Sequence, residues 1–234
     1  MIVYAHRGAS EYAPENTLMS FYLGMLQGAN GIETDVHFTK DGKLVLFHDD
    51  TVDRVTNGTG EVEKMTYAEL SALDVLHPAD PAIVDKIPLF EDFLRLFSFR
   101  PITFAIELKS DGIEKEVISL LEKYKMREKT IITSFEYDYI RAVKQADAGY
   151  RVGWLIKEHT PETLRLLADI GAEQICPRAT FVTPDYVRDM RGQGLDVRAW
   201  GVKDADLMIN CCKSNVDGMT VNFPDRLISY LNAR

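Results

Sequence analysis

The sequence predicts an α/β fold of the (β/α)₈ barrel (TIM barrel) type. Short runs rich in β-branched residues alternate with amphipathic segments along most of the chain, which is typical of a parallel sheet with crossover helices. About eight such units can be counted in the 234 residues, and that number favours a closed barrel over an open, doubly wound sheet. We therefore expect a single domain, residues 1–234.

The first strand–helix unit begins at residue 2. IVYAH (2–6) is short and apolar, and it predicts the first strand. The segment 17–29 has the spacing of a helix, and Asn16 or Thr17 could cap its start.

The second unit is longer and is followed by an irregular stretch. GIETDVHF (31–38) predicts the second strand, and KLVLFH (43–48) predicts an extended run that a turn at 40–42 joins to it. We count 43–48 as an extension of this unit. Residues 49–86 are rich in turn-forming residues, with one short helical segment at 66–73, and we interpret 49–86 as a small insertion after the second unit.

Regular alternation then returns and continues to the end of the chain. The segment 88–97 predicts a helix with Pro88 in its first turn, and Thr160 with Pro161 predicts a later helix start. The six further expected strands are 103–109, 130–134, 151–156, 174–178, 196–202 and 218–222. The expected helices between and after them are 113–126, 136–146, 161–170, 184–192, 204–212 and a last one from residue 224.

Charge, apolar segments and cysteine spacing argue against several classes of partner and location. The formal net charge of −9 argues against a nucleic-acid or anionic-lipid partner, so an anionic ligand must be attracted locally. No secretory signal or membrane-spanning stretch is evident, and we expect no stable membrane association. Three cysteines without metal-ligand spacing favour reduced thiols and a cytoplasmic location. Monomer and homo-oligomer both remain open.

Polar residues gather where the first strands end. In a barrel of this type the functional residues lie at the C-terminal ends of the strands. The polar residues at or near those ends are His6, Arg7, Glu33, Asp35, His48, Asp49, Glu107 and Lys109.

The acids predict a metal site. Glu33 and Asp35 are two residues apart in a strand, so both point to one face, and Glu107 with Lys109 repeats that spacing on the neighbouring strand. Any one acid alone could be an exposed charge. Three crowded carboxylates are costly to keep ionised without a cation, and oxygen ligands suit Mg²⁺ or Ca²⁺, with Mn²⁺ as a further choice.

Two histidines flank the acids. His6 or His48 alone could be a core histidine that donates to a backbone carbonyl. Because both histidines lie at strand ends beside the acids, they favour a pair of general acid and general base. Which histidine has which role stays open. We expect His37 to face away from the acids and His77 and His159 to lie in loops, and we assign them no role.

Several motifs resemble the glycerophosphodiester phosphodiesterase family. They are HRGASEYAPENT (6–17), ETDVHFTKDGKLVLFHDDTVDRVTNGTG (33–60), IPLFEDFL (87–94), IELK (106–109) and DGMTVNFPDRL (217–227). The resemblance covers nearly the whole chain and implies a TIM barrel with an insertion after the second unit. It also implies metal ligands at Glu33, Asp35 and Glu107, an acid–base pair at His6 and His48, and phosphate contacts at Arg7 and Lys109.

The resemblance implies an activity as well. The substrate would be a small glycerophosphodiester, and the products would be sn-glycerol 3-phosphate and an alcohol such as choline or ethanolamine. The nucleophile would be water or the neighbouring glycerol hydroxyl. Two other functions stay open: a lysophospholipase D type hydrolase, which needs an apolar entrance, and a non-catalytic glycerophosphodiester-binding barrel.

A few residues near the motifs have two interpretations. Phe135 and Trp200 fall at strand ends where they could contact substrate or simply pack against helices. Asn16 could hydrogen-bond near the metal site or cap the helix. We interpret Asp49 and Arg54 as structural supports of the insertion.

Overall fold

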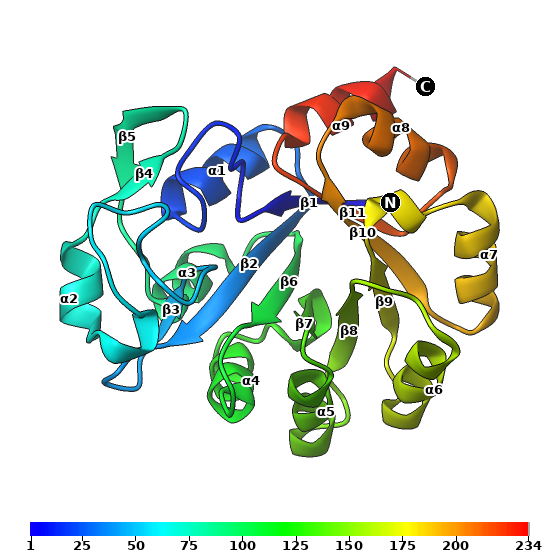
Figure 1. Ribbon diagram of the computed structural model, residues 1–234, viewed down its shortest axis with the longest axis horizontal. Coiled ribbons are helices and arrows are strands. Elements are labelled where there is room, and N and C mark those ends of the chain that lie inside the picture. The colour runs from blue at the N-terminus through cyan, green and yellow to red at the C-terminus, as the bar shows by residue number, and fades with distance from the viewer. Residues whose placement is uncertain (234) are drawn as a thin grey trace.

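The chain folds as a closed barrel of parallel strands surrounded by helices, as the computed structural model of residues 1–233 shows (Figure 1). The sheet order is β1-β11-β10-β9-β8-β7-β6-β2-β3, and an additional parallel pairing of β1 with β2 closes the ring. The parallel strands are β1 (Ile2–His6), β2 (Gly31–Phe38), β6 (Thr103–Leu108), β7 (Thr130–Ser134), β8 (Arg151–Ile156), β9 (Gln174–Pro177), β10 (Asp196–Val202) and β11 (Gly218–Val221). The predicted barrel is confirmed.

A helix follows each unit and covers the outside of the ring (Figure 1). These helices are α1 (Leu18–Leu26), α3 (Phe90–Phe97), α4 (Glu114–Lys123), α5 (Tyr137–Ala146), α6 (Pro161–Ile170), α7 (Pro184–Gly192), α8 (Ala205–Lys213) and α9 (Pro224–Asn232). Thr17 caps α1 by accepting from the backbone N–H of Ser20, and Thr160 caps α6 in the same way. No helix within residues 1–233 combines the length and apolarity that crossing a membrane requires.

An antiparallel strand and the insertion follow the second barrel strand, β2. β3 (Leu44–Leu46) pairs antiparallel with β2, which agrees with an extension of the second unit. The irregular stretch after it holds a short 3₁₀ helix η1 (Val62–Lys64) and α2 (Tyr67–Ala72). It also holds a hairpin of β4 (Val75–His77) and β5 (Asp80–Asp85), which the sequence did not predict.

That hairpin connects the insertion to the loop between β1 and α1 and to the first turn of α1. The His77 imidazole Nε2 lies 3.2 Å from the backbone oxygen of Glu11, and the backbone N–H of Met19 donates to Asp85 at 2.9 Å. β5 is largely exposed and lacks an apolar alternation, so its sequence resembles a loop. The insertion therefore packs beside the C-terminal end of β1.

The packing between strands and helices is apolar, whereas the inside of the barrel is partly polar. Phe21, Phe93 and Phe104 are fully buried between the strands and α1 and α3. Inside the ring, the 1% exposed Arg198 donates to Gln174 at 3.0 Å and to Thr220 at 2.8 Å. A buried arginine with these partners places a fixed positive charge inside the barrel.

Candidate active site

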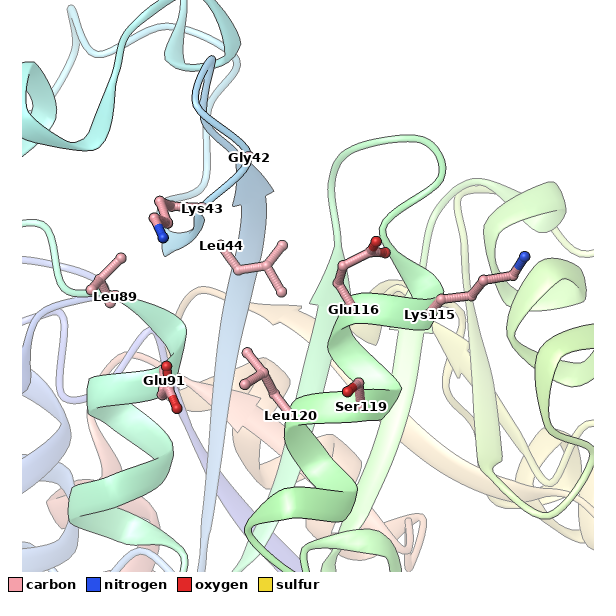
Figure 2. Close-up of a pocket in the computed structure, with 9 residues that line it drawn as sticks. All are labelled: Gly42, Lys43, Leu44, Leu89, Glu91, Lys115, Glu116, Ser119 and Leu120. Atoms are coloured by element: carbon pink, nitrogen blue, oxygen red, sulfur yellow. The ribbon is translucent and has the colours of Figure 1, made fainter.

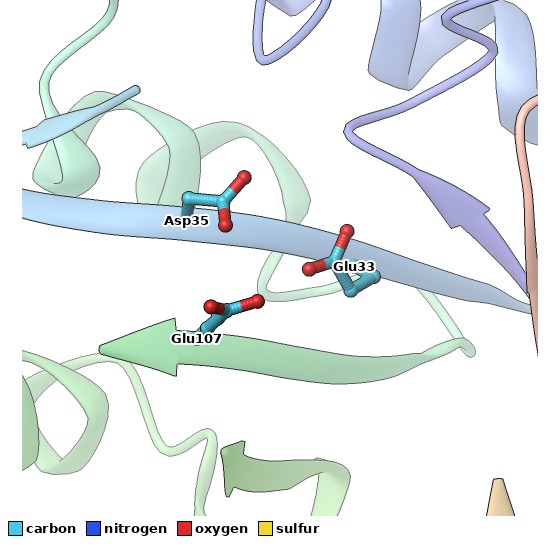
Figure 3. Close-up of side chains that lie close together, drawn as sticks. All are labelled: Glu33, Asp35 and Glu107. Atoms are coloured by element: carbon cyan, nitrogen blue, oxygen red, sulfur yellow. The ribbon is translucent and has the colours of Figure 1, made fainter. Parts of the chain in front are cut away.

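The strand register brings the three predicted metal ligands together. Asp35 on β2 is the direct neighbour of Glu107 on β6, and Glu33 lies beside His6 of β1. Each of the three acids offers a carboxylate oxygen within 4.8 Å of the others, and their side chains turn toward one another (Figure 3). All three are buried, with exposures of 3%, 0% and 6% for Glu33, Asp35 and Glu107.

Burial and mutual repulsion shift the pKa values of the three acids. Loss of hydration, followed by repulsion from Asp35 and Glu107, raises the pKa of Glu33 to about 8. Burial and the charge of Asp35 likewise raise the pKa of Glu107. Although burial opposes it, the positive charges of Lys109 and Arg7 hold the pKa of Asp35 well below its usual range.

The donor set fits a divalent cation. The Oδ1 atom of Asp35 is buried and has no hydrogen-bond partner, while Oδ2 accepts from the Asn16 side-chain amide at 2.8 Å. Carboxylate oxygens without competing donors are the ligands that Mg²⁺ and Ca²⁺ prefer. The three acids could therefore hold such a cation, which would offset their mutual repulsion.

Two cationic side chains border the acids. Lys109 Nζ lies 2.8 Å from Glu107 Oε1 and 3.6 Å from Asp35 Oδ1, and Arg7 Nε lies 3.5 Å from Asp35 Oδ2. Arg7 has a positive φ of 54°. Its backbone N–H donates to the Glu33 carbonyl at 3.0 Å, so β2 holds this unfavourable backbone conformation in place.

Both predicted catalytic histidines lie at the edge of this cluster, about three-tenths exposed. His6 Nδ1 is 2.6 Å from the Asn222 side-chain oxygen, and His6 Nε2 is 4.0 Å from Glu33. His48 Nδ1 is 2.5 Å from the Asp49 carboxylate. In each ring Nδ1 has a partner, which leaves Nε2 as the nitrogen available for proton transfer.

The environment of His6 also determines its charge. Loss of hydration, followed by the positive charge of Arg7, lowers the pKa of His6 to about 3. The ring is therefore neutral near pH 7. A neutral ring whose Nδ1–H donates to Asn222 carries its lone pair on Nε2.

A cavity of about 470 Å³ opens beside Glu107 and Lys109. Its lining includes the backbone or side chains of His48, Asp49, Asp50, Glu107, Leu108, Lys109, Ser134, Phe135, Glu136, Tyr139 and Lys157. Phe135 makes an edge-to-face contact with Trp200 at 5.0 Å between ring centroids. Phe135 thus reaches the site, whereas Trp200 is not part of this lining and packs behind it.

A different cavity, of about 430 Å³, lies away from these residues, between the β2–β3 turn and helices α3 and α4 (Figure 2). Leu44, Leu89 and Leu120 line it together with charged side chains such as Glu91. It contains none of the predicted site residues. We assign the chemistry to the barrel mouth, because the three buried acids of residues 1–233 meet two cationic side chains and two histidines there.

The roles of four residues were missed at the level of sequence. The side-chain oxygen of Asn222, which follows β11, pairs with His6 Nδ1, and Glu15 accepts from Arg7 Nη1 at 2.8 Å. Asp49 and Arg54 were interpreted as supports of the insertion, yet Asp49 bonds directly to His48. All three of Asn222, Glu15 and Arg54 lie in quoted motifs, but only Asn222 also follows a strand end, so only its position offered a structural signal.

The expectation for His37 was wrong. Residues 33, 35 and 37 have the same parity in one strand, so alternation places them on one side of it. His37 lines a smaller cavity together with Lys109, and its Nε2 lies 3.3 Å from the backbone oxygen of His48. It packs behind His48.

Fold and site together are those of a barrel enzyme whose polar residues gather at the C-terminal ends of the strands. The chain belongs to the glycerophosphoryl diester phosphodiesterase family, whose model matches residues 6–226. It is 33% identical to a glycerophosphodiester phosphodiesterase of Caldanaerobacter subterraneus, over 98% of this chain and 97% of that protein. It is 32% identical to one of Bacillus subtilis, over 96% and 84% of the two chains.

Solved structures agree with these relatives. A glycerophosphodiester phosphodiesterase from Agrobacterium tumefaciens is 28% identical with a TM-score of 0.87, over 98% of this chain and 99% of that one. A phosphodiesterase from Oleispira antarctica, solved in complex with the product sn-glycerol 3-phosphate, is 26% identical with a TM-score of 0.89. That match covers 99% of this chain and 97% of the other. The chain is therefore an enzyme of the phosphodiesterase class.

Proposed function

We propose that this enzyme hydrolyses glycerophosphodiesters to sn-glycerol 3-phosphate and an alcohol, and that it depends on a divalent cation held by Glu33, Asp35 and Glu107. The observation that carries the proposal is the convergence of these buried acids with two cations and two histidines at one barrel mouth. The product complex of the Oleispira antarctica relative supports the choice of substrate. Choline, ethanolamine and glycerol are the head groups we expect.

Arg7 and Lys109 bind the phosphate in this proposal. A bound Mg²⁺, Ca²⁺ or Mn²⁺ would supply further positive charge against the phosphate oxygens. Arg7 and Lys109 contact different oxygens of Asp35, at 3.5 and 3.6 Å, so they approach a ligand above the acids from two directions. Fixed positive groups of this kind stabilise the charge of a phosphoryl-transfer transition state.

The histidines divide the proton transfers. His6 is neutral near pH 7, and its Nε2 accepts the proton of the nucleophile, which is water or the neighbouring glycerol hydroxyl. His48 donates a proton to the leaving oxygen, and the Asp49 carboxylate, 2.5 Å from its Nδ1, orients the ring for that transfer. A ³¹P NMR time course would reveal a cyclic phosphate if the glycerol hydroxyl attacks.

The cellular setting is also proposed. We propose that residues 1–234 act as one domain with 49–86 as its insertion, in the cytoplasm, on a small soluble substrate and without nucleic acid or stable membrane association. The insertion offers a hairpin with an exposed β5 rather than an apolar lid. This favours deacylated substrates over the lysolipids of a lysophospholipase D.

The test is a metal-depleted sample assayed for sn-glycerol 3-phosphate and alcohol release. Glycerophosphocholine, glycerophosphoethanolamine and glycerophosphoglycerol are supplied with Mg²⁺, Ca²⁺ or Mn²⁺ added back, beside lysophosphatidylcholine at matched concentration. We expect turnover of the deacylated substrates only with metal. Full activity in a chelator would contradict the metal requirement, and ligand binding without turnover under every condition would favour the non-catalytic barrel.

A further inference from the structure

Arg54 contacts two carboxylates that belong to separate segments of the chain. Its Nε donates to Asp49 Oδ2 at 2.5 Å. Its two terminal nitrogens donate to Glu15, Nη1 to Oε2 at 2.9 Å and Nη2 to Oε1 at 2.7 Å. Glu15 lies in the loop between β1 and α1, whereas Asp49 follows β3, so one guanidinium bridges the two sides of the site.

Each of these carboxylates also holds a residue of the site. Asp49 uses its other oxygen, Oδ1, to accept from His48 Nδ1 at 2.5 Å. Glu15 Oε1 accepts from Arg7 Nη1 at 2.8 Å. A continuous chain of charged hydrogen bonds therefore runs from His48 through Asp49, Arg54 and Glu15 to Arg7.

From Asp49 through Arg54 and Glu15 to Arg7 the charges alternate, which favours the ionised form of the two carboxylates. Burial opposes ionisation of Glu15, but hydrogen bonding to Arg54 and the charges of Arg54 and Arg7 lower its pKa below the usual range. Glu15 is 13% exposed as a side chain, and Arg54 is 46% exposed. The bridge thus lies at the rim, with its inner end at Arg7, whose side chain is 15% exposed.

We propose that Arg54 is a positioning residue that orients His48 and Arg7 together. The proposal rests on the proposed function, because it assumes that His48 transfers a proton and that Arg7 binds phosphate. An exposed ion pair contributes little to folding stability. Holding a proton donor and a phosphate ligand in one relative geometry contributes to the rate, because small misplacements of reacting groups are costly.

The planar guanidinium is essential to this role. It presents three donors in a fixed plane, one to Asp49 and a parallel pair to Glu15. A lysine ammonium keeps the charge but has no such planar fork. Arg54→Lys should therefore behave like Arg54→Ala in turnover, whereas a residue that only supports the insertion by its charge would be rescued by lysine.

The experiment compares Arg54→Ala and Arg54→Lys with Lys86→Ala. Lys86 is a matched control, because it also lies in the insertion and its Nζ forms an ion pair with Asp74 at 2.8 Å, away from the site. We expect Arg54→Ala to lower kcat about tenfold through His48 and to raise KM several-fold through Arg7. Lys86→Ala should change neither by more than about twofold. Methylguanidinium in solution should restore part of the Arg54→Ala activity.

Two measurements test the positioning role of Arg54 separately from the proposed hydrolysis. Long-range ¹⁵N NMR of the histidine rings reports His48 without turnover, and we expect Arg54→Ala to shift the His48 signals and leave those of His159 unchanged. Double-mutant cycles of Arg54→Ala with Asp49→Asn and with Glu15→Gln should be non-additive, the first in kcat and the second in KM.

The outcomes are distinct. A wild-type enzyme that turns over no glycerophosphodiester would overturn the proposed function. The histidine spectra would still show whether Arg54 orients the His48 ring. An active wild type with unchanged kcat, KM and His48 signals in Arg54→Ala would overturn the positioning role alone. So would a loss in Arg54→Ala that Arg54→Lys fully restores, or one that Lys86→Ala reproduces together with the same drop in Tm.

Discussion

The two halves of the barrel mouth differ in chemistry. The half formed by the ends of β1, β2, β3 and β6 carries the buried acids, both flanking cations and both histidines. The half formed by the ends of β7 to β10 presents Phe135 and Trp200 in edge-to-face contact. Lys157 and Arg178 lie over those two rings, at 5.4 and 5.0 Å from the centroids.

This difference suggests a division of labour. The buried acids within residues 1–233 all lie on β2 and β6, so the carboxylates that could hold a cation belong to one half. The two rings of the other half supply shape and contact area, and the cations Lys157 and Arg178 lie over those rings. Changes in the charged half should therefore alter turnover by large factors, and changes in the aromatic half should alter affinity by small ones.

The histidines should show the largest effect. We expect His6→Ala and His48→Ala each to lower kcat by about 10³-fold, within the usual range for a general acid or base, and to leave metal affinity nearly unchanged. Steady-state kinetics with isothermal titration of Mn²⁺ measures both quantities. His159→Ala is the control, because His159 contacts Tyr186 instead of the site. Near-normal kcat in either variant would remove that histidine from the mechanism.

The metal ligands should show the next largest effect. Glu107→Ala and Asp35→Ala are expected to weaken divalent-cation binding on the order of 100-fold, because each removes a charged oxygen from a set of three. Activity should fall at fixed metal and recover in part at high metal, which titration of kcat against Mn²⁺ would reveal. Glu116→Ala, on the exposed side of α4, should behave as wild type. Unchanged metal dependence would contradict the ligand assignment.

The barrel and the acid cluster could be predicted from sequence because both depend on local patterns. Strand and helix periodicity indicated eight units, and the two-residue spacing of Glu33 and Asp35 predicted a common side. The parallel register then set Asp35 beside Glu107. Strand-end placement also indicated His6 and His48, whose roles remain predictions.

The contacts of the rim could not be predicted in the same way. Glu15 and Arg54 are 39 residues apart, both lie in irregular segments, and no periodicity relates them. The β4–β5 hairpin is exposed on most of β5, so its sequence lacks the apolar alternation that marks strands. Such contacts depend on how two loops pack against each other, which is a property of the folded chain.

The free energy of unfolding as a function of pH would test how Glu33 ionises within the charged half of the barrel mouth. In the metal-free chain the pKa of Glu33 is raised from 4.5 to about 8, so the folded state retains a proton that the unfolded state releases. The stability linked to this proton is complete below pH 4.5 and is lost as pH rises through about 8. We expect the free energy of unfolding to fall on the order of 3 kcal/mol between pH 5 and 8 in a chelator.

Glu33→Gln tests the origin of that slope. Urea unfolding at several pH values should give a flatter dependence for Glu33→Gln, because the amide does not titrate. Glu116→Gln, an exposed control, should keep the wild-type slope. Equal slopes in wild type and Glu33→Gln would show that another group is responsible.

The aromatic half should show the smallest effect, and Phe135 should exceed Trp200. Phe135 lines the cavity beside Lys109, so Phe135→Leu removes part of a substrate-facing wall and should raise KM a few-fold with little change in kcat. Trp200 donates its indole N–H to the Cys176 carbonyl at 3.0 Å and packs behind Phe135. Trp200→Phe should therefore lower Tm by a few degrees while KM stays within about twofold. If either variant instead lost turnover as severely as the histidine variants, the division between the two halves would be wrong, since these rings would then contribute to the transition state.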